Sequence, residues 1–534
     1  MRFQALGKHA GLAVLVGSVI AALAFLHGWR THHLKGGEEF GVDVFYHVTM
    51  ADGGALFCMR RTFPHTTQSI WRDHFYDKEF LFHLYLGAVR EWERLIRGRD
   101  APPPFEVGYL AVAALIIAVF AFVLYKVDDR YGFIWMLAFV LLSPGFRNRL
   151  SMLRPHHFSI ALMTLAAFFF IRMKDGPKEL WKPVLLTFLF VYSYSNPHFI
   201  LIPAAMAAAF FLLEGKAKKA AALFGAALFS LVLFMTAHPQ FPNTFICWKV
   251  QCVDVITRIL EGGGDTGIAS ELVAPSRSWK LYNAGVFALW VWNAVLFAYL
   301  LRRRTLGRES AFYFSLATLF FVGLFFSVRS VEYAFPFALL CSASLCRDLD
   351  KAGVFETWQI YAVAALLLVG LPLATFGWSS KLRLTPKCEF SGFGVWAKRH
   401  LPPGAVVANI GWGDFTRLFH AAPHCRYLVG LDPMFGFAAN PELASKMRAF
   451  HKGEYIISPR EMRVITGADF AFVGAADHSE RRRAYVMAKY LSYRPVYHGS
   501  DGTLFILPAA ARRLPPPRKK SGISPSRDPS PPQP

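Results

Sequence analysis

Residues 107–125 read VGYLAVAALIIAVFAFVLY, a run without a single charged side chain. A helix that crosses a membrane needs about 20 mainly apolar residues, so this run predicts a membrane span. The whole chain of 534 residues has the same character, with 54% hydrophobic and only 18% charged residues. A soluble domain usually has about 25% charged residues. The composition excludes a soluble enzyme and a disordered chain, and it indicates a polytopic α-helical membrane protein.

Other apolar runs bring the expected number of spans to about 11. They lie at 11–29, 132–146, 155–171, 183–197, 199–213, 220–237, 280–301, 311–327, 333–346 and 358–378. The run at 11–29 follows Arg2 and Lys8, as a signal peptide would, but Gly28-Trp29-Arg30 offers no cleavage site with small residues. We therefore expect it to be a retained first span.

The basic residues predict the topology. The chain has 58 Lys and Arg against 36 Asp and Glu, a net charge of +22. Alternate joints between the spans are basic, namely 126–131, 172–182, 214–219, 302–309 and 347–357. Cytoplasmic joints carry such an excess, so the N-terminus is expected in the cytoplasm and the C-terminal segment outside. In a Gram-negative cell this would be the inner membrane with a periplasmic domain. This placement of the charge argues against a nucleic-acid partner.

Three larger segments are expected on the outer side. Within a transmembrane domain of residues 1–378, they are the first outer loop 30–106 and a second large loop 238–279. Residues 379–510 change in composition and alternate helix-like with strand-like runs, which predicts a small extracytoplasmic α/β domain. The Pro-rich, basic residues 511–534 are typical of a disordered tail.

The first outer loop opens with an acidic and aromatic motif. It reads Asp43-Val-Phe-Tyr-His47, directly after the first expected span and the acidic Glu38-Glu39. A carboxylate at the membrane surface can deprotonate an acceptor hydroxyl, or hold a divalent metal against a phosphate leaving group. The alternative is a solvated loop with an aromatic anchor at the interface.

This motif, the long first outer loop, the many spans and the external C-terminal segment resemble the GT-C superfamily of membrane glycosyltransferases. The Asp-x-Phe-Tyr-His form is most similar to the catalytic subunits of oligosaccharyltransferases. The resemblance implies a polyprenyl-phosphate-linked sugar donor, a membrane lipid partner, and a first-loop acid, Asp43, that binds acceptor and metal. The metal would be Mg²⁺ or Mn²⁺. The family often has a second acid two residues away, whereas this chain has Gly41 and Phe45 there.

Further along the same loop lies a second group of polar residues. Asp77, Glu79 and His83 occur within seven positions, and Glu79 and His83 are spaced to share one helix face. Asp77 or Glu79 would supply a second acid to the Asp43 site, with His47 in support, and His83 would line the acceptor site or the cavity. The alternative is an amphipathic helix whose charged face lies among lipid headgroups.

Arginines on the outer side mark a candidate phosphate site. The next outer joint contains Arg147, Arg149 and Arg154, against the trend for basic residues to lie inside. Arginine can bind phosphate with two parallel hydrogen bonds, so we expect Arg154 to bind the donor phosphate. Ordinary phospholipid headgroups are the alternative. His156 and the neighbouring His157 are weaker candidates for a cavity or a metal.

Two more outer joints contain candidate residues. Asn196 and His198 flank Pro197 where the fifth and sixth spans are interrupted, and they would line the cavity or form a simple polar turn. Arg329 lies close to Glu332 at another outer end. The resemblance implies a second donor-phosphate contact at Arg329, whereas a structural Arg329–Glu332 pair is the alternative.

In the C-terminal segment, Trp412-Gly-Asp414 is similar to an acceptor-recognition motif of oligosaccharyltransferases. Asp414 is equally suited to begin a helix. Gly430-Leu-Asp432-Pro433 is typical of a turn. Neither Cys247 with Cys252 nor Cys388 with Cys425 can be assigned as a disulfide from sequence.

Together these residues favour an inverting glycosyltransferase that moves a sugar from a polyprenyl-phosphate donor to an extracytoplasmic glycan, lipid or protein. One alternative is en bloc transfer of an oligosaccharide to protein. Another is a transporter or flippase of lipid-linked glycans, although transporters usually show repeats and mid-membrane polar residues that this sequence lacks.

Overall fold

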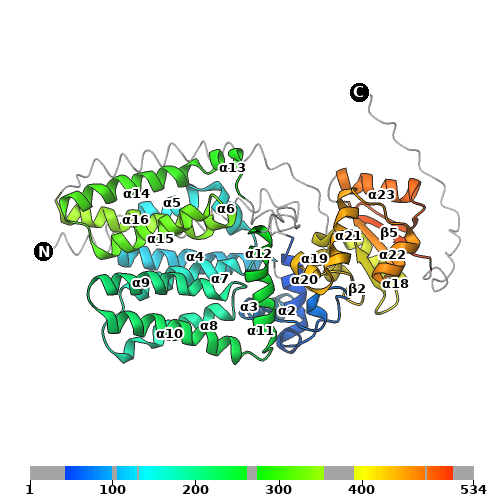
Figure 1. Ribbon diagram of the computed structural model, residues 1–534, viewed down its shortest axis with the longest axis horizontal. Coiled ribbons are helices and arrows are strands. Elements are labelled where there is room, and N and C mark those ends of the chain that lie inside the picture. The colour runs from blue at the N-terminus through cyan, green and yellow to red at the C-terminus, as the bar shows by residue number, and fades with distance from the viewer. Residues whose placement is uncertain are drawn as a thin grey trace, which may run out of the picture.

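The computed structural model describes residues 42–98, 105–128, 132–260, 274–353, 390–475 and 478–508. Within these ranges the chain forms a bundle of long helices and, beside it, a smaller part built on a β-sheet (Figure 1). Helices from the first outer segment lie between the two parts. The expected spans at 11–29 and 358–378, the tail 511–534 and Cys388 lie outside the described residues.

The bundle consists of helices whose positions follow the apolar runs of the sequence. They are α4 (Phe105–Val127), α5 (Gly132–Leu141), α6 (Pro144–Ser151), α7 (His156–Ile171), α8 (Trp181–Val191), α9 (Leu201–Leu213), α10 (Ala217–Thr236), α14 (Ala284–Arg303), α15 (Arg308–Gly323) and α16 (Val331–Lys351). Among the described residues, three stretches are long and apolar enough to cross a membrane, namely Val107–Val127, Ala217–Thr236 and Ala284–Arg303. The helical and apolar character of the chain is therefore as predicted.

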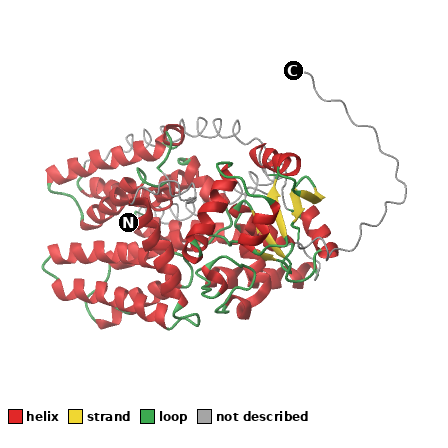
Figure 2. Cartoon of the chain, turned by 45° about the vertical axis from the view of Figure 1, so that its right-hand side comes forward, coloured by secondary structure: helices red, strands yellow, loops and turns green. Residues whose placement is uncertain are grey.

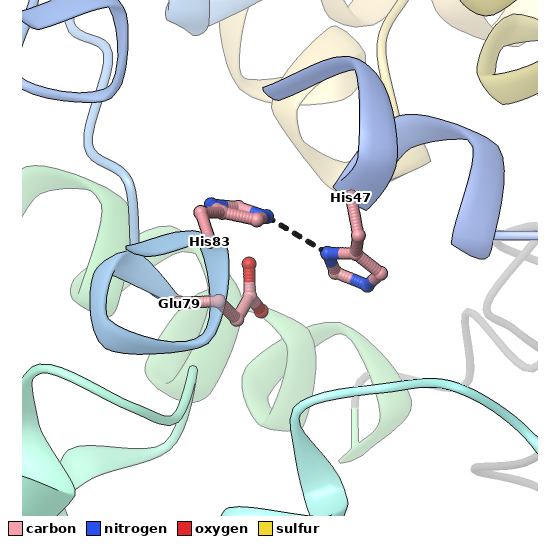
Figure 3. A group of neighbouring side chains, drawn as sticks. All are labelled: His47, Glu79 and His83. Atoms are coloured by element: carbon pink, nitrogen blue, oxygen red, sulfur yellow. Dashed lines mark hydrogen bonds between the residues drawn. The ribbon is translucent and has the colours of Figure 1, made fainter. Parts of the chain in front are cut away.

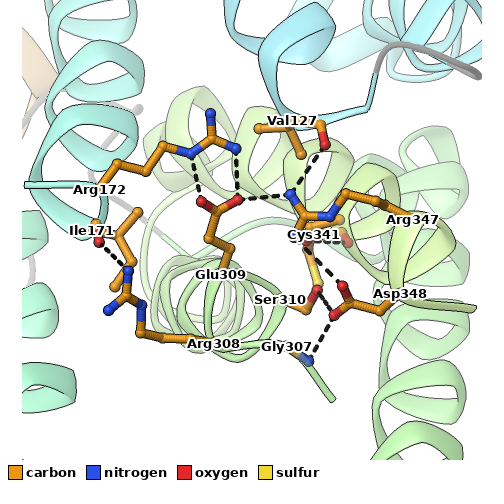
Figure 4. Close-up of polar contacts among 11 residues, drawn as sticks. Val127, Ile171, Arg172, Gly307, Arg308, Glu309, Ser310, Cys341, Arg347 and Asp348 are labelled. Carbon is orange, nitrogen blue, oxygen red and sulfur yellow. Dashed lines mark hydrogen bonds and ion pairs between the residues drawn. The ribbon is translucent and has the colours of Figure 1, made fainter. Parts of the chain in front are cut away.

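An ionic network ties three helices together at the end of the bundle away from the sheet (Figure 4). The Glu309 carboxylate accepts hydrogen bonds from Arg172 at 2.5 and 2.7 Å and from Arg347 at 2.8 Å. The nearby Asp348 carboxylate accepts hydrogen bonds from the Ser310 hydroxyl and the Gly307 amide. These residues come from the basic joints 172–182 and 302–309 and from the last turn of α16, so these segments meet at one end of the bundle.

A second group of helices lies at the end of the bundle that faces the sheet. They are α2 (Val44–Cys58), α3 (Phe80–Arg97), α11 (Asn243–Trp248), α12 (Val255–Leu260) and α13 (Arg277–Tyr282), with a 3₁₀ turn at Ile70–Arg72 and a π-helical turn at Lys249–Asp254. Most of them belong to the segments 30–106 and 238–279, in which the sequence suggests large outer loops. In the structure these loops are largely helical and packed.

The C-terminal part contains a five-stranded sheet with the order β2-β1-β3-β5-β4 (Figure 2). The strands are β1 (Val406–Asn409), β2 (Arg426–Tyr427), β3 (Phe470–Gly474), β4 (Arg494–His498) and β5 (Gly502–Ile506). β1 is parallel to β2 and β3, whereas β5 is antiparallel to β3 and β4. This mixed sheet is consistent with the expected α/β domain.

Helices cover both faces of the sheet. Alternate strand residues point to opposite sides, and the residues on both sides are apolar. Val407, Phe470 and Phe472 belong to one apolar cluster, and Ala408 and Ala471 belong to the other. The first cluster includes α18 (Ser391–His400) and α19 (Phe415–Ala421), and the second includes α21 (Pro441–Lys452), α22 (Pro459–Thr466) and α23 (His478–Tyr490).

Local sequence explains where several of these helices begin. Asp432, Asn440 and Ser458 each accept a backbone N–H of the following helix, and each is followed by a proline in the first helical position. A polar cap with proline behind it satisfies or removes the free N–H groups of the first turn. The segment after Asp432 is therefore a short helix, α20 (Pro433–Ala439), and the Asp-Pro pair that suggests a turn marks its start.

The first outer segment and the sheet are joined by backbone and side-chain contacts. Thr66 pairs with Tyr427 of the edge strand β2, and the amide of Gln68 donates to the Leu428 carbonyl at 2.8 Å. Trp71 and Phe415 stack around Tyr46 of α2 in the same apolar cluster. The helix that carries the Asp43–His47 motif is therefore anchored on the C-terminal part as well as on the bundle.

Candidate functional site

Asp43 forms an ion pair with Arg154, which brings together two residues that the sequence singles out separately. The carboxylate Oδ2 lies 2.8 Å from an Arg154 guanidinium nitrogen. Asp43 immediately precedes α2 but makes no side-chain cap bond to it, so its carboxylate is directed to the arginine. Arg154 precedes Pro155, which disfavours helix at that position and leaves the guanidinium at the start of α7. Both side chains are partly exposed, so a ligand can reach them.

A buried chain of hydrogen bonds runs next to this pair. His47 lies one helical turn after Asp43, and its Nδ1 is 2.9 Å from Nε2 of His83. The other nitrogen of His83, Nδ1, is 2.8 Å from Oδ2 of Asp77. All three side chains are buried. A carboxylate on one side of an imidazole fixes its orientation and tautomer, so Asp77 positions His83 toward His47.

Glu79 faces the two histidines. Its carboxylate points toward the space between the imidazole rings (Figure 3). One ligand atom each from His47, Glu79 and His83 all lie within 4.8 Å of one another. Glu79 Oε2 is buried without a hydrogen-bond partner among the described residues. Burial raises the pKa of Glu79. Burial also lowers the pKa of His47 well below its usual value, and the neighbouring His83 and Arg154 lower it further.

The groups of this cluster fit a divalent cation. A cation would use the unpartnered oxygen of Glu79 as a ligand. Its positive charge would also compensate the negative charge of the Glu79 carboxylate, which burial disfavours. Cys58, Asp77 and His83 form a second, overlapping group of possible ligand atoms. Asp43, to which the sequence assigns the metal, belongs to neither group and is paired with Arg154 instead.

Gln240 is a supporting residue that sequence reasoning missed. Its side-chain carbonyl accepts a hydrogen bond from the Asp77 amide at 2.8 Å, and its amide donates to the Cys58 carbonyl at 3.0 Å. Gln240 comes from the second large outer segment, far from Asp77 in sequence. A lone glutamine after a span gives no signal in the sequence, so only the three-dimensional contact reveals its role.

Arg329 and Arg149 share one buried acid. Arg149 Nε donates to Glu332 Oε1 at 2.7 Å, and Arg329 Nε lies 3.8 Å from the same oxygen. Glu332 is fully buried at the start of α16. The closer partner of Glu332 is thus Arg149, and Arg329 remains partly exposed beside the ring of Tyr194.

His156 and His157 bind the backbone of the loop that carries the arginines. His156 Nε2 lies 2.8 Å from the Arg149 carbonyl, and His157 Nδ1 lies 2.9 Å from the Arg154 carbonyl. The two rings are in contact, with centroids 4.4 Å apart. Within the described residues neither histidine belongs to a group of possible metal ligands. Their observed contacts hold the segment 149–154 against α7.

Asn196 and His198 contact the second large outer segment. The Cys252 thiol donates to Asn196 Oδ1 at 3.1 Å, and the Trp248 indole donates to His198 Nδ1 at 3.1 Å. Cys247 and Cys252 are both free thiols. The break at Pro197 therefore serves as a contact point for the segment Asn243–Asp254.

Trp412 and Asp414 have different surroundings although they are two residues apart. Trp412 lines a cavity in the C-terminal part, whereas Asp414 is buried and accepts a hydrogen bond from the Gly474 amide at 3.3 Å. Burial, and next to it the charge of Glu480, raises the pKa of Asp414 to about 7. The two residues do not face the same space, and neither shares a described contact with Asp43.

Comparisons with known proteins concern the sequence and the overall fold of the chain. No protein-family model and no curated protein matches the sequence. Among solved structures, the chain is similar to the oligosaccharyltransferase of Archaeoglobus fulgidus tethered to an acceptor peptide, with a TM-score of 0.60 and 15% identity over 94% of this chain and 74% of that one. The chain therefore has the same fold as this oligosaccharyltransferase.

Two further structures have the same fold. The Archaeoglobus fulgidus enzyme in complex with Zn and sulfate matches with a TM-score of 0.56 and 13% identity, over 92% of this chain and 73% of that one. ArnT from Cupriavidus metallidurans bound to undecaprenyl phosphate matches with a TM-score of 0.50 and 13% identity, over 95% and 98%. At these identities the likeness defines the fold, and the chemistry has to be argued from the residues of this chain.

Proposed function

We propose that this chain is an integral-membrane glycosyltransferase that moves a sugar from a polyprenyl-phosphate donor to an extracytoplasmic acceptor. The observation that carries the proposal is the Asp43–Arg154 pair at the end of an apolar helix bundle with the GT-C fold. A base and a phosphate-binding cation side by side are the two groups that transfer from a glycosyl phosphate requires.

In the proposed reaction, Arg154 exchanges its partner. The donor phosphodiester carries one negative charge, as a carboxylate does, and gains a second as its bond to the sugar breaks, so the guanidinium binds the phosphate most strongly in the transition state. Asp43 is then free to accept the proton of an acceptor hydroxyl. The acceptor oxygen forms a bond to the anomeric carbon on one face while the bond to the phosphate oxygen breaks on the other. The products are an inverted glycoside and polyprenyl phosphate, whose negative charge Arg154 stabilises.

Arg329 is the second proposed phosphate ligand. Its side chain is partly exposed, so a ligand can reach the guanidinium. The hydrogen bond of 2.8 Å between Ser159 and Tyr333 holds the start of α16 against α7. The helix that follows Arg329 is thus fixed relative to the helix that follows Arg154.

His47, Glu79 and His83 would hold a divalent metal. Two imidazoles and one carboxylate favour Mn²⁺ or Zn²⁺ over Mg²⁺, which prefers oxygen ligands only. Ligands about 2.05 Å from a tetrahedral ion lie about 3.3 Å apart, so the 2.9 Å contact between the two histidines needs to open only slightly. A bound cation would polarise the acceptor or neutralise phosphate charge, while Asp77 keeps His83 oriented.

The orientation of the protein follows from the same proposal. The joints that form the Glu309 network are basic and meet at one end of the bundle, which we assign to the cytoplasm. Asp43 and the sheet then lie on the outer side, where a lipid-linked donor presents its sugar.

The test is product release in proteoliposomes. Purified full-length protein is incubated with polyprenyl-phosphate sugars and, as the acceptor, with the surface glycans, glycolipids and proteins extracted from its host, and free polyprenyl phosphate is measured by mass spectrometry. We expect release that Arg154→Ala lowers at least tenfold, whereas Arg302→Ala, in a joint at the other end of the bundle, leaves it unchanged. Translocation of intact donor without release would contradict the proposal and support a flippase.

A further inference from the structure

A cavity of about 420 Å³ lies in the C-terminal part, separate from the Asp43 site. It is bounded by the ends of β1 and β2, by the turn that contains Trp412, and by α20 and α21. Ligand sites in α/β sheets commonly occur at the carboxyl ends of parallel strands, which is where this cavity opens. Its volume is within the range of pockets that hold small molecules.

The inner wall of the cavity is apolar. Trp412, Phe437 and Met447 line it together with aliphatic side chains of the strands. Two of the three amide side chains in the wall already bind the backbone, since Asn409 Oδ1 accepts the Leu428 amide at 3.1 Å and Asn440 caps α21, and Gln68 is the third. The wall therefore favours an aryl or aliphatic group over the many hydroxyls of a sugar.

One side of the cavity is cationic. Arg448, His451 and Lys452 all line it, and their spacing of three and four residues places them on the same face of α21. None of the described residues that line the cavity is acidic. The last turn of a helix also carries partial negative charge, and Lys452 lies 3.8 Å from the carboxylate of Glu454, which does not line the cavity; the two cations Arg448 and Lys452 together outweigh these charges. A ligand that carries a negative charge at one end is the complement of this surface.

We propose that the cavity binds a small amphipathic anion, an aryl or acyl group that carries a carboxylate or a phosphate. The apolar part would stack on Trp412 and contact Met447, and the anionic end would meet Arg448 and Lys452. The proposal of this binding site does not rest on the proposed glycosyl transfer, because Asp43, Arg154 and the residues that contact them do not line the cavity.

The cavity is nevertheless connected to the first outer segment through α20. Phe437 of α20 lines the cavity, whereas Phe435 of the same short helix contacts Trp71 and lies 5.7 Å from the Lys78 ammonium. Lys78 lies between Asp77 and Glu79 in sequence. A ligand that fixes α20 would therefore also fix the surroundings of these two acids.

The test uses the full chain in phosphatidylcholine nanodiscs and 6-fluoro-2-naphthoate as the probe, with binding followed by ¹⁹F NMR. The neutral probe is the matched 6-fluoro-2-naphthamide. We expect the acid to bind at least tenfold more tightly than the amide, and Arg448→Ala with Lys452→Ala to remove that preference. Lys446→Ala, on the same helix but outside the cavity and paired with Glu461 at 2.7 Å, is the matched control and should bind as wild type does.

A second variant tests the apolar wall. Ala444→Trp fills the cavity and should abolish binding of both probes, and the double alanine variant decides the question if this one does not fold. Equal binding of acid and amide, or binding that survives both variants, would overturn the proposal. Phosphatidylglycerol in the nanodisc separates two sources of the anion. Displacement of the probe identifies a lipid headgroup as the ligand, and no displacement identifies a soluble anion.

Discussion

The ion pair between Asp43 and Arg154 makes donor binding and catalysis respond in opposite ways to one substitution. In the proposed mechanism Arg154 must leave Asp43 before it binds phosphate, so the free energy of the pair opposes donor binding. The side chains of Arg154 and Asp43 are 15% and 28% exposed. Exposed pairs contribute about 0.2–1 kcal/mol, and the limited exposure of this pair places it near 1 kcal/mol. Asp43→Asn removes that opposition and should tighten binding of polyprenyl phosphate by about fivefold, while it abolishes transfer.

The assay is a titration of nanodisc-embedded protein with undecaprenyl phosphate, followed by calorimetry. Arg154→Ala should weaken binding of undecaprenyl phosphate, because a hydrogen bond to a charged group contributes about 1.5–3 kcal/mol. About 1 kcal/mol of this loss is offset, because the variant has no Asp43–Arg154 pair to break before the phosphate binds. Asp73→Asn is the matched control, since Asp73 also pairs with an arginine, Arg72 at 2.7 Å, on an exposed surface of the same segment. Tenfold weaker binding by Asp43→Asn, or unchanged binding by Arg154→Ala, would refute the exchange.

Three further predictions concern buried groups. Glu332→Gln removes the acid that pairs with the buried Arg149 guanidinium. The substitution should lower the free energy of unfolding by about 3–5 kcal/mol. An unchanged unfolding midpoint in detergent would contradict this. Burial and the neighbouring Glu480 raise the pKa of Asp414 to about 7. The folded state then keeps a proton that the unfolded state releases above about pH 4, so stability should fall between about pH 4 and 7, and Asp414→Asn should remove that fall; parallel pH profiles of unfolding would be the opposing result. Glu79→Gln and His83→Ala should each reduce bound Mn²⁺ or Zn²⁺ at least tenfold, measured by elemental mass spectrometry against the Asp73→Asn control, and equal metal contents would exclude this cluster as the metal site.

Much of the fold follows from local sequence. The run 107–125 predicts α4, and the run 220–237 predicts α10, because the requirement to cover about 30 Å of hydrocarbon is met within one continuous segment. The strand-like runs expected within residues 379–510 are likewise present, for example as β1 and β3. The start of α20 is less predictable, because Asp432 followed by Pro433 suits a turn and a helix cap equally well.

The candidate site is predictable as a set of residues but not as an arrangement. Asp43, Asp77 and Arg154 stand out because charges beside apolar runs are costly without a purpose. Their partners depend on contacts between distant segments, so the sequence does not show that Arg154 pairs with Asp43 or that Gln240 holds Asp77. That His47, Glu79 and His83 form a group of possible metal ligands without Asp43 is visible only in three dimensions.

The most direct test of glycosyl transfer through Asp43 is mass spectrometry of surface glycans and glycolipids from a deletion strain. The strain is complemented with wild type, with Asp43→Asn or with the Asp73→Asn control, at equal amounts of protein in the membrane. We predict that the deletion removes one sugar mass, and that wild type and Asp73→Asn restore it whereas Asp43→Asn does not. Restoration of the same mass by Asp43→Asn would contradict the assignment of Asp43 as the base.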